Sequence, residues 1–121
     1  MVFVIAVHQL ITMQFVALEK EEQLNDIKES EGYNIIFKHN VTCPISKSVR
    51  RHFEADAEQL QKVDTVYFLD LLAHRNLSDD IAEHFGVPHQ SPQLLLICGG
   101  KCTYNEALYN ITAEQAVKAI H

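Results

Sequence analysis

One stretch of the chain, residues 34–46, constrains the possible folds more than any other. It contains a short apolar run, Ile35–Phe37, whose composition predicts a strand buried on both faces. A polar loop follows, and Pro44 then suits the first turn of a helix, where the missing proline N–H costs no intrahelical bond. Apolar residues recur at every fourth position of this helix, at Ile45, Val49 and Phe53. The stretch therefore predicts a strand, a loop and a helix, with Cys43 at the helix boundary.

A cysteine at the start of a helix has a defined chemistry. The unpaired N–H groups of the first turn and the positive end of the helix dipole favour a thiolate there. A thiolate attacks disulfides, and a thiol that ionises easily is also a good leaving group when a mixed disulfide is resolved. Cys43 is therefore our candidate for reversible thiol–disulfide exchange. The alternative is an inert, small, buried cysteine that only packs.

Composition narrows the class of protein. The chain has 121 residues, enough for one domain with a single core. Its hydrophobic share of 47% and charged share of 21% are ordinary for a soluble globular protein, which argues against disorder. The net charge of −6 argues against a nucleic-acid binder. The three cysteines form no paired framework, so we expect a reducing, cytoplasmic compartment.

The segment before Glu19 carries no Asp, Glu, Lys or Arg and begins with an apolar run at residues 2–7. It lacks the basic residues and the cleavage site of a signal peptide. Polar residues interrupt it before it reaches the ~20 apolar residues of a membrane span, so we expect no stable membrane insertion. We interpret residues 1–12 as an extension, either an extra strand or a misassigned start before Met13. Residues 13–121 form one predicted domain.

Helices and strands are expected to alternate along the rest of the chain. A polar helix with one apolar stripe is predicted at 19–30, and the helix after Pro44 is expected to fade near residues 60–62. A strand is predicted at 65–69. Asn76 or Ser78 is the expected cap of the next helix, and Gly86 is expected to close it.

The C-terminal third completes the predicted fold. We expect a strand at 93–98, a two-residue turn at Gly99–Gly100 into a strand at 101–104, and a last helix opened by a capping box at 112–115. The order β-α-β-α-β-α-β-β-α predicts an α/β fold with a mixed central sheet and helices on both faces. Cys43 would then lie at the carboxyl end of its strand, where ligands meet open α/β sheets.

Four short strings of this sequence carry a resemblance to a known family. They are Phe37-Lys38-His39, Thr42-Cys43-Pro44-Ile45-Ser46, His89-Gln90-Ser91-Pro92-Gln93 and Ile111-Thr112-Ala113-Glu114. Over residues 14–121 the chain resembles the YtxJ-like bacillithiol-system proteins, or monothiol bacilliredoxins, which have a thioredoxin-like fold. Cys98 and Cys102 do not belong to these motifs.

The resemblance implies a redox function. It implies that Cys43 removes bacillithiol from mixed disulfides on oxidised client proteins, and that a second low-molecular-weight thiol, free bacillithiol, resolves it. It implies no bound cofactor, with bacillithiol as a co-substrate. It also makes Ser91–Pro92 the expected cis peptide beside the cysteine, with the Ser91 backbone pairing with the backbone of the bound thiol.

Several residues near Cys43 are predicted to support it, and each has an alternative. Ser46 stands where a two-cysteine motif would place its resolving thiol, so the site should stop at a mixed disulfide; Ser46 either bonds to the Cys43 thiolate or is simply exposed. Thr42 and Pro44 flank the cysteine. His39 is a candidate base or an ordinary surface histidine. His89 is the other candidate wall of the site.

Positive charge also gathers around the predicted site. Lys38, Lys47, Arg50 and Arg51 would oppose the overall negative sign of the chain and favour a thiol that carries carboxylates. A solvated helix face is the alternative interpretation of the last three.

The other two cysteines invite a disulfide or a zinc site. In a Gly99–Gly100 hairpin Cys98 faces Lys101 and Cys102 faces Ile97, so the two thiols point to opposite sides of the sheet. We expect no metal site, because no second pair of ligands accompanies them. Cys98 is predicted to pack in the core and Cys102 to be peripheral; the alternative for Cys102 is a distant resolving thiol. A phosphatase loop is set aside, since Val49 stands where its arginine would be.

Two further functions stay open. One is a non-catalytic thioredoxin-like binding module in which Cys43 is silent. The other is a monothiol glutaredoxin-like protein acting on another low-molecular-weight thiol, although its usual Cys-Gly-Phe-Ser is absent. The readiness of Cys43 to ionise would separate an exchange protein from a silent module.

Overall fold

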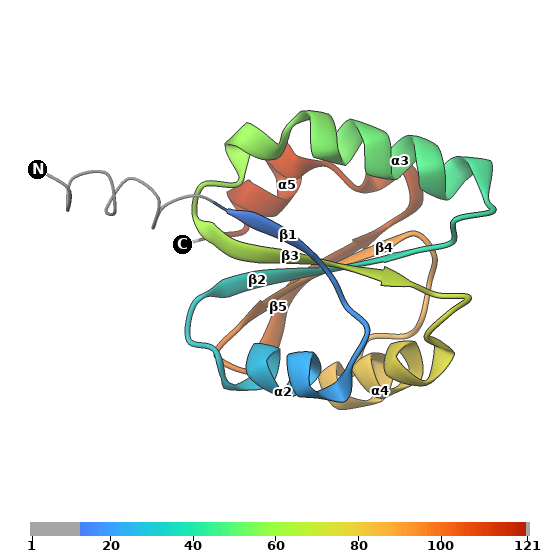
Figure 1. Cartoon of the computed structure of the whole chain (residues 1–121). Coiled ribbons are helices and arrows are strands. Elements are labelled where there is room, and N and C mark those ends of the chain that lie inside the picture. Colours follow the sequence, from blue (N-terminus) through green and yellow to red (C-terminus); the bar gives the residue numbers. More distant parts are fainter. Residues whose placement is uncertain (1–12, 121) are drawn as a thin grey trace, which may run out of the picture.

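The computed structural model describes residues 13–120, which form one mixed five-stranded sheet between two layers of helices (Figure 1). The elements in chain order are β1 (Gln14–Ala17), α2 (Glu21–Glu29), β2 (Tyr33–His39), α3 (Pro44–Ala55), β3 (Val63–Asp70), α4 (Arg75–Phe85), β4 (Gln93–Cys98), β5 (Lys101–Ala107) and α5 (Ala113–Lys118). Short 3₁₀ turns lie at Ala57–Gln59 and Leu108–Asn110. The predicted order of elements and the predicted mixed sheet are confirmed.

The strands are ordered β1-β3-β2-β4-β5 across the sheet. The first three are mutually parallel, whereas β4 runs antiparallel to β2 with Gln93 opposite Lys38. Because of these directions, the loop that follows β2 and the loop that precedes β4 lie at the same end of the sheet. Cys43 belongs to the first of these connections and Pro92 to the second.

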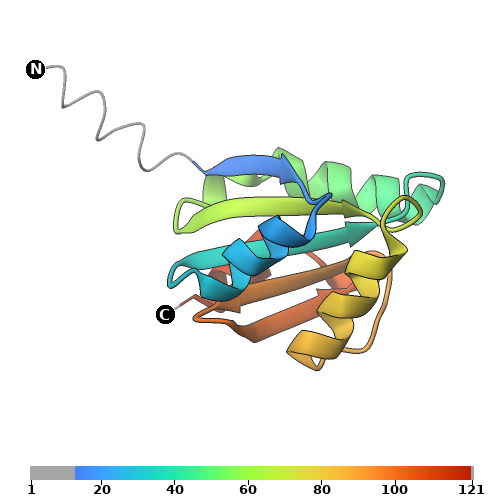
Figure 2. The same cartoon turned by 60° about the horizontal axis from the view of Figure 1, so that its bottom comes forward.

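Central strand β2 is buried from Asn34 to His39, as its apolar run predicted. Alternate residues point to opposite faces. Ile35 and Phe37 join the core beneath α3 and α5, and Ile36 joins the core above α2 and α4. Figure 2 shows α2 and α4 side by side on one face of the sheet, with α3 on the other.

The helix that begins at Pro44 differs from its prediction in length and in its buried stripe. It ends at Ala55, and a 3₁₀ turn rather than more α-helix leads to Leu60. Val49 and Phe53 are buried, but Ile45 is 37% exposed because the first turn extends past the end of the sheet. The apolar stripe is therefore shorter than the sequence suggested.

The start of α4 was predicted too late. The helix begins at Arg75 with His74 as its N-cap, so Asn76 and Ser78 lie inside it rather than capping it. Asp70 explains the early start, since its Oδ1 accepts hydrogen bonds from the backbone N–H groups of Leu72 at 3.0 Å and Ala73 at 3.4 Å. The chain therefore turns immediately after β3, and α4 can begin at Arg75.

The predicted turn positions are confirmed. Gly86 closes α4 in the left-handed conformation with φ of 68°. Gly99 and Gly100 have φ of 60° and 77°, as a tight hairpin turn requires. Thr112 caps α5 by accepting the N–H of Gln115 at 3.1 Å.

At the N-terminal side, β1 forms an edge strand parallel to β3. The predicted extension at residues 1–12 lies outside the described residues. Within residues 13–120, no helix is long and apolar enough to cross a membrane.

Candidate functional site

Cys43 is the N-cap residue of α3, and Pro44 is the first residue of that helix, as predicted. The Cys43 side chain belongs to a half-buried residue at the end of the sheet. Its backbone N–H donates to the Asn40 carbonyl at 3.1 Å, and its carbonyl accepts the N–H of Lys47 at 3.0 Å. Both bonds fix the main chain of Cys43 and leave its thiol at the open N-terminal end of the helix.

The loop before Cys43 is organised by Asn40, a residue that the sequence analysis did not single out. Its side-chain Oδ1 accepts two hydrogen bonds from Thr42, one from the backbone N–H at 2.9 Å and one from the hydroxyl at 2.7 Å. Asparagine commonly bonds to the backbone two residues later in such turns, and that tendency was the available signal. The role of Thr42 is therefore to hold the loop through Asn40.

Ser46 is buried and only 1% exposed, so the exposed-serine alternative is wrong. Its Oγ accepts the backbone N–H of Asn40 at 3.2 Å, which ties the first turn of α3 to the end of β2. Ser46 lies three positions after Cys43, with two residues between them. Donation from the Ser46 hydroxyl to a Cys43 thiolate stays a prediction.

The Ser91–Pro92 peptide is cis, as the resemblance implied. Pro92 is buried, and its carbonyl accepts the N–H of Leu108 at 3.0 Å. Within residues 13–120, the buried Oγ of Ser91 has no hydrogen-bond partner. The antiparallel pairing of β2 with β4 brings this peptide to the end of the sheet that carries Cys43.

His89 lies in the same loop but contacts α4. Its Nδ1 is 3.3 Å from the hydroxyl of Ser78. Burial and then the positive charges of Lys38 and Arg75 lower the pKa of His89, which keeps its ring neutral at pH 7. His89 thus links the loop to Ser78 on α4, and its predicted place as a wall around Cys43 stays a prediction.

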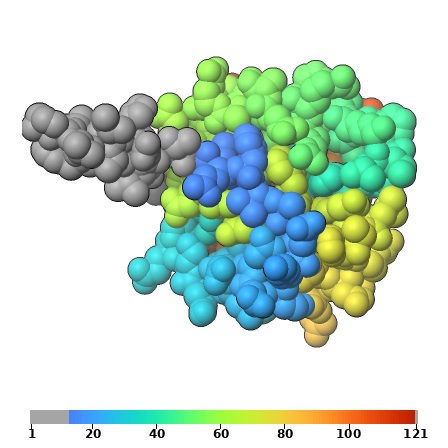
Figure 3. Space-filling view, in the orientation of Figure 1, coloured from blue at the N-terminus to red at the C-terminus, as the bar shows by residue number. Residues whose placement is uncertain are grey.

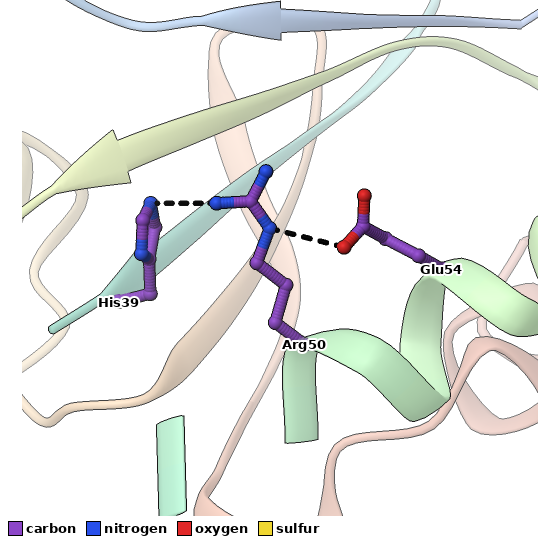
Figure 4. A network of polar contacts seen from close by, with 3 residues as sticks. All are labelled: His39, Arg50 and Glu54. Carbon is purple, nitrogen blue, oxygen red and sulfur yellow. Dashed lines mark hydrogen bonds and ion pairs between the residues drawn. The ribbon is translucent and has the colours of Figure 1, made fainter. Parts of the chain in front are cut away.

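His39 is buried, with 5% of its surface exposed, so the surface alternative is wrong. Its Nε2 is 3.2 Å from Nη1 of Arg50, whose Nε also pairs with Glu54 at 3.1 Å (Figure 4). Because a guanidinium only donates, Nε2 is the acceptor. Burial first, and Arg50 second, lower the pKa of His39. Its acceptor nitrogen is therefore occupied, which is a poor arrangement for a base that serves Cys43.

Lys38 was predicted to add positive charge near Cys43 from the end of its strand, but its side chain lies on the α4 face of the sheet, away from the helix that Cys43 begins. Strand alternation sends it to the opposite side of the sheet, where its Nζ donates to the Ser78 carbonyl at 3.0 Å. Lys47 and Arg51 are exposed on α3. Arg50 lies with its guanidinium 3.9 Å from the ring centre of Phe68.

A cavity of about 330 Å³ lies beside this cluster, between β1 and α3. In Figure 3 it falls between the blue atoms of β1 and the green atoms of α3. Phe15, Phe68, His39, Arg50 and Asp70 are among its lining residues, whereas Cys43 is not. The cavity therefore flanks the cysteine site without including the thiol.

Cys98 and Cys102 are both free, and the hairpin pairs Cys98 with Lys101 and Cys102 with Ile97, as predicted. Both residues are half-buried, and Cys102 rather than the predicted Cys98 packs against a core. Cys102 packs against the core above α2 and α4, and burial raises the pKa of its thiol. The half-buried Cys98 donates from its Sγ to the Glu31 carbonyl at 3.5 Å. No group of three potential metal ligands occurs within residues 13–120.

Comparison with known proteins identifies the family. The family model described as "Monothiol bacilliredoxin BrxC" matches residues 16–116. The chain belongs to the monothiol bacilliredoxin BrxC family. A solved structure described as an oxidoreductase with a thioredoxin fold is 30% identical, with a TM-score of 0.74, and the match covers 87% of this chain and 92% of the other.

Two thioredoxins show the same fold at lower identity. Mitochondrial thioredoxin 3 from Saccharomyces cerevisiae is 22% identical with a TM-score of 0.66, and the match covers 88% of this chain and 95% of that one. Thioredoxin from Trypanosoma brucei brucei is 17% identical with a TM-score of 0.65, covering 91% and 88%. This bacilliredoxin family member therefore has a thioredoxin-like fold, and its family supports a thiol–disulfide redox role.

Proposed function

We propose that this protein removes bacillithiol from mixed disulfides on oxidised client proteins, with Cys43 as the attacking thiol. One observation supports this most strongly. Cys43 stands at the open N-terminus of α3, while the position three residues later holds a buried serine that is bonded to Asn40. The Cys43 thiol is therefore open to a disulfide substrate, and no thiol at position 46 can displace what it binds.

The reaction has two exchange steps. The Cys43 thiolate attacks the bacillithiol sulfur of the client's mixed disulfide, the old S–S bond breaks, and the client leaves as a thiolate that takes a proton from solvent. Free bacillithiol, as its thiolate, then attacks the bacillithiol sulfur on Cys43 and releases the Cys43 thiolate. The products are the reduced client and bacillithiol disulfide, which joins the transferred bacillithiol to one free bacillithiol. One disulfide thus replaces another, and each cap removed consumes one free thiol.

The surroundings of Cys43 suit these partners. The main chain of Ser91, before the cis proline, is available at the same end of the sheet to pair with an extended segment of the substrate. Lys47 and Arg51, exposed on α3, would attract a low-molecular-weight thiol that carries carboxylates. A reducing, cytoplasmic compartment would keep Cys43, Cys98 and Cys102 as free thiols.

Intact-mass spectrometry tests the proposal. The protein and its Cys43→Ser variant are each mixed with a model protein that carries a bacillithiol cap, and with the same protein capped by glutathione. We expect the mass of the unmodified chain to increase by one bacillithiol, attached at Cys43. The client should lose the same mass and return to its free thiol. The Cys43→Ser variant should do neither, and a Cys102→Ser variant should behave like the unmodified chain.

The glutathione arm separates the remaining functions. Faster transfer of glutathione than of bacillithiol would replace the bacillithiol assignment by a glutaredoxin-like one. Transfer of neither cap would leave a non-catalytic binding module. Preference for the bacillithiol cap would establish the co-substrate.

A further inference from the structure

Lys38 is a buried charged side chain that the exchange reaction does not use directly. It lies on β2 five residues before Cys43 and is 0% exposed. Burial lowers its pKa to about 8, so the ammonium still predominates at neutral pH. Burying an ammonium is costly unless hydrogen bonds compensate, and its Nζ donates to the carbonyl of Ser78 on α4 at 3.0 Å.

The polar groups around Lys38 converge on the loop before Pro92. The hydroxyl of Ser78, which is itself fully buried, lies 3.3 Å from Nδ1 of His89. Gln93, which pairs with Lys38 in the sheet, donates from Nε2 to the Pro88 carbonyl at 2.9 Å, and its Oε1 accepts the N–H of Gln90 at 3.4 Å. Two buried polar side chains, Ser78 and Gln93, thus contact residues 88–90, and Lys38 bonds to the main chain of the first.

We propose that Lys38 is a positioning residue for the exchange reaction, which through Ser78 and α4 holds the 88–91 loop where Ser91 receives the main chain of the client. The inference rests on the proposed function, because it assigns Lys38 to the client-binding half of the same site. Lys38 acts from the α4 face of the sheet, whereas Cys43 begins the helix on the other face.

Charged and titratable groups surround Lys38 on two elements. Asp79 on α4 favours its protonated form. Arg75 on α4 and Lys38 both lower the pKa of His89 in the loop, so the His89 ring is neutral next to the Ser78 hydroxyl. Loss of the Lys38 proton turns a charge-assisted hydrogen bond to Ser78 into a weaker neutral one. The Lys38–Ser78 hydrogen bond, and with it the positioning of residues 88–91, should therefore weaken as pH rises through about 8.

The test compares two substrates in the unmodified protein and in Lys38→Met. One is a client protein with a bacillithiol cap, which needs the loop; the other is 2-hydroxyethyl disulfide, which has no peptide main chain. The ratio of the client rate to the 2-hydroxyethyl disulfide rate does not depend on the ionisation of Cys43, because both substrates react with the same thiol.

Lys38→Met should lower this ratio about tenfold, as expected for a misplaced binding element. Ser78→Ala should also lower it. Lys101→Met, on exposed β5, is the matched control and should leave the ratio unchanged.

The pH profile adds a readout that a purely structural role would not move. In the unmodified protein the ratio should fall as pH rises through about 8, and in Lys38→Met it should be flat. A folded Lys38→Met variant with the ratio and pH profile of the unmodified protein would overturn the inference.

Hydrogen exchange keeps the inference separate from the proposed function. If the unmodified protein removes no cap, the proposed function fails, yet the backbone amide of Gln90 still reports on the loop. Faster exchange of this amide in Lys38→Met, with Lys101→Met unchanged, would support positioning by Lys38. Equal exchange in all three proteins would refute it.

Discussion

Cys43 owes its environment to three neighbouring side chains that hold the main chain around it. Asn40 bonds twice to Thr42, and Ser46 bonds back to the N–H of Asn40, so the loop and the first helical turn form one hydrogen-bonded unit. A thiol on such a preorganised turn does not need to order the loop when it attacks. At this scale the chemistry depends on Cys43 and on the absence of a second thiol at position 46.

Replacing that serine by cysteine should change the end point of the reaction. Positions three apart at a helix start meet the Cα separation of about 4.4–6.8 Å that a disulfide requires. With a capped client and no free thiol, Ser46→Cys should release the bacillithiol and end as an internal disulfide, which intact mass detects as the loss of two hydrogens. Ser48→Cys, on the same helix, is the control. Persistence of the mixed disulfide in Ser46→Cys would contradict the assigned geometry.

A second prediction at the residue scale concerns the stability cost of Lys38. Because its pKa is lowered from the ordinary 10.5 to about 8, the unfolded chain binds this proton more tightly than the folded chain between these values. The contribution of Lys38 to stability therefore improves as pH rises from about 8 to about 10.5. Lys38→Met should raise the free energy of unfolding by about 1–3 kcal/mol at pH 7.

Urea denaturation at several pH values checks this cost. The advantage of Lys38→Met over the unmodified protein should shrink as pH approaches 10.5. An advantage that does not depend on pH would mean that the pKa of Lys38 is the same in the folded and the unfolded chain, and would contradict the lowered value. A variant that unfolds more readily at pH 7 would contradict the predicted penalty.

The sequence anticipated some of these residues better than others. Cys43 could be found because a thiol next to Pro44 marks a helix start. The burial of Ser46 and Lys38 could not, since polar side chains are usually exposed and only the completed fold shows what covers them. His39 was missed as a buried residue for the same reason, because Arg50 and Phe68 approach it from distant parts of the chain.

At the scale of elements, β2 and α3 form the framework of the site. Their boundaries were predictable because an apolar run ends at a polar loop and Pro44 favours the first helical turn. The start of α4 was not, because the Asp70 carboxylate that bends the chain lies on the preceding strand. The turn that Asp70 forms with Leu72 and Ala73 ends before the helix, and the N-cap His74 makes no side-chain cap bond, so the usual capping pattern is missing.

The contact between these two elements can be tested through His39. Arg50 on α3 lowers the pKa of His39 on β2, and it also helps to cover the ring. Arg50→Met should therefore raise the pKa of His39, as followed by NMR titration of its ring. Arg51→Met, one position along the same helix, is the matched control and should leave the titration of His39 unchanged. An unchanged His39 in Arg50→Met would mean that the contact does not persist in solution.

For the whole molecule, the sheet order explains how two distant segments meet. Because β2 and β4 are antiparallel neighbours, the Cys43 loop and the Ser91–Pro92 loop share one end of the sheet, although about fifty residues separate them. The alternation of strands and helices predicted a mixed sheet, whereas only the family resemblance implied that the Ser91–Pro92 loop lies beside Cys43. The sequence did not reveal the polar cluster of Lys38, Ser78 and His89, because it forms only when α4 packs on the sheet.

The central claim is that one thiol is sufficient for turnover. The most direct measurement follows the removal of bacillithiol from a capped client, with free bacillithiol in excess, by a Cys98→Ser/Cys102→Ser variant whose only cysteine is Cys43. The account predicts many turnovers at the rate of the unmodified protein, and none when Cys43→Ser is added. Loss of turnover in the single-cysteine variant would show that a second thiol of the chain resolves the mixed disulfide and would contradict the monothiol mechanism.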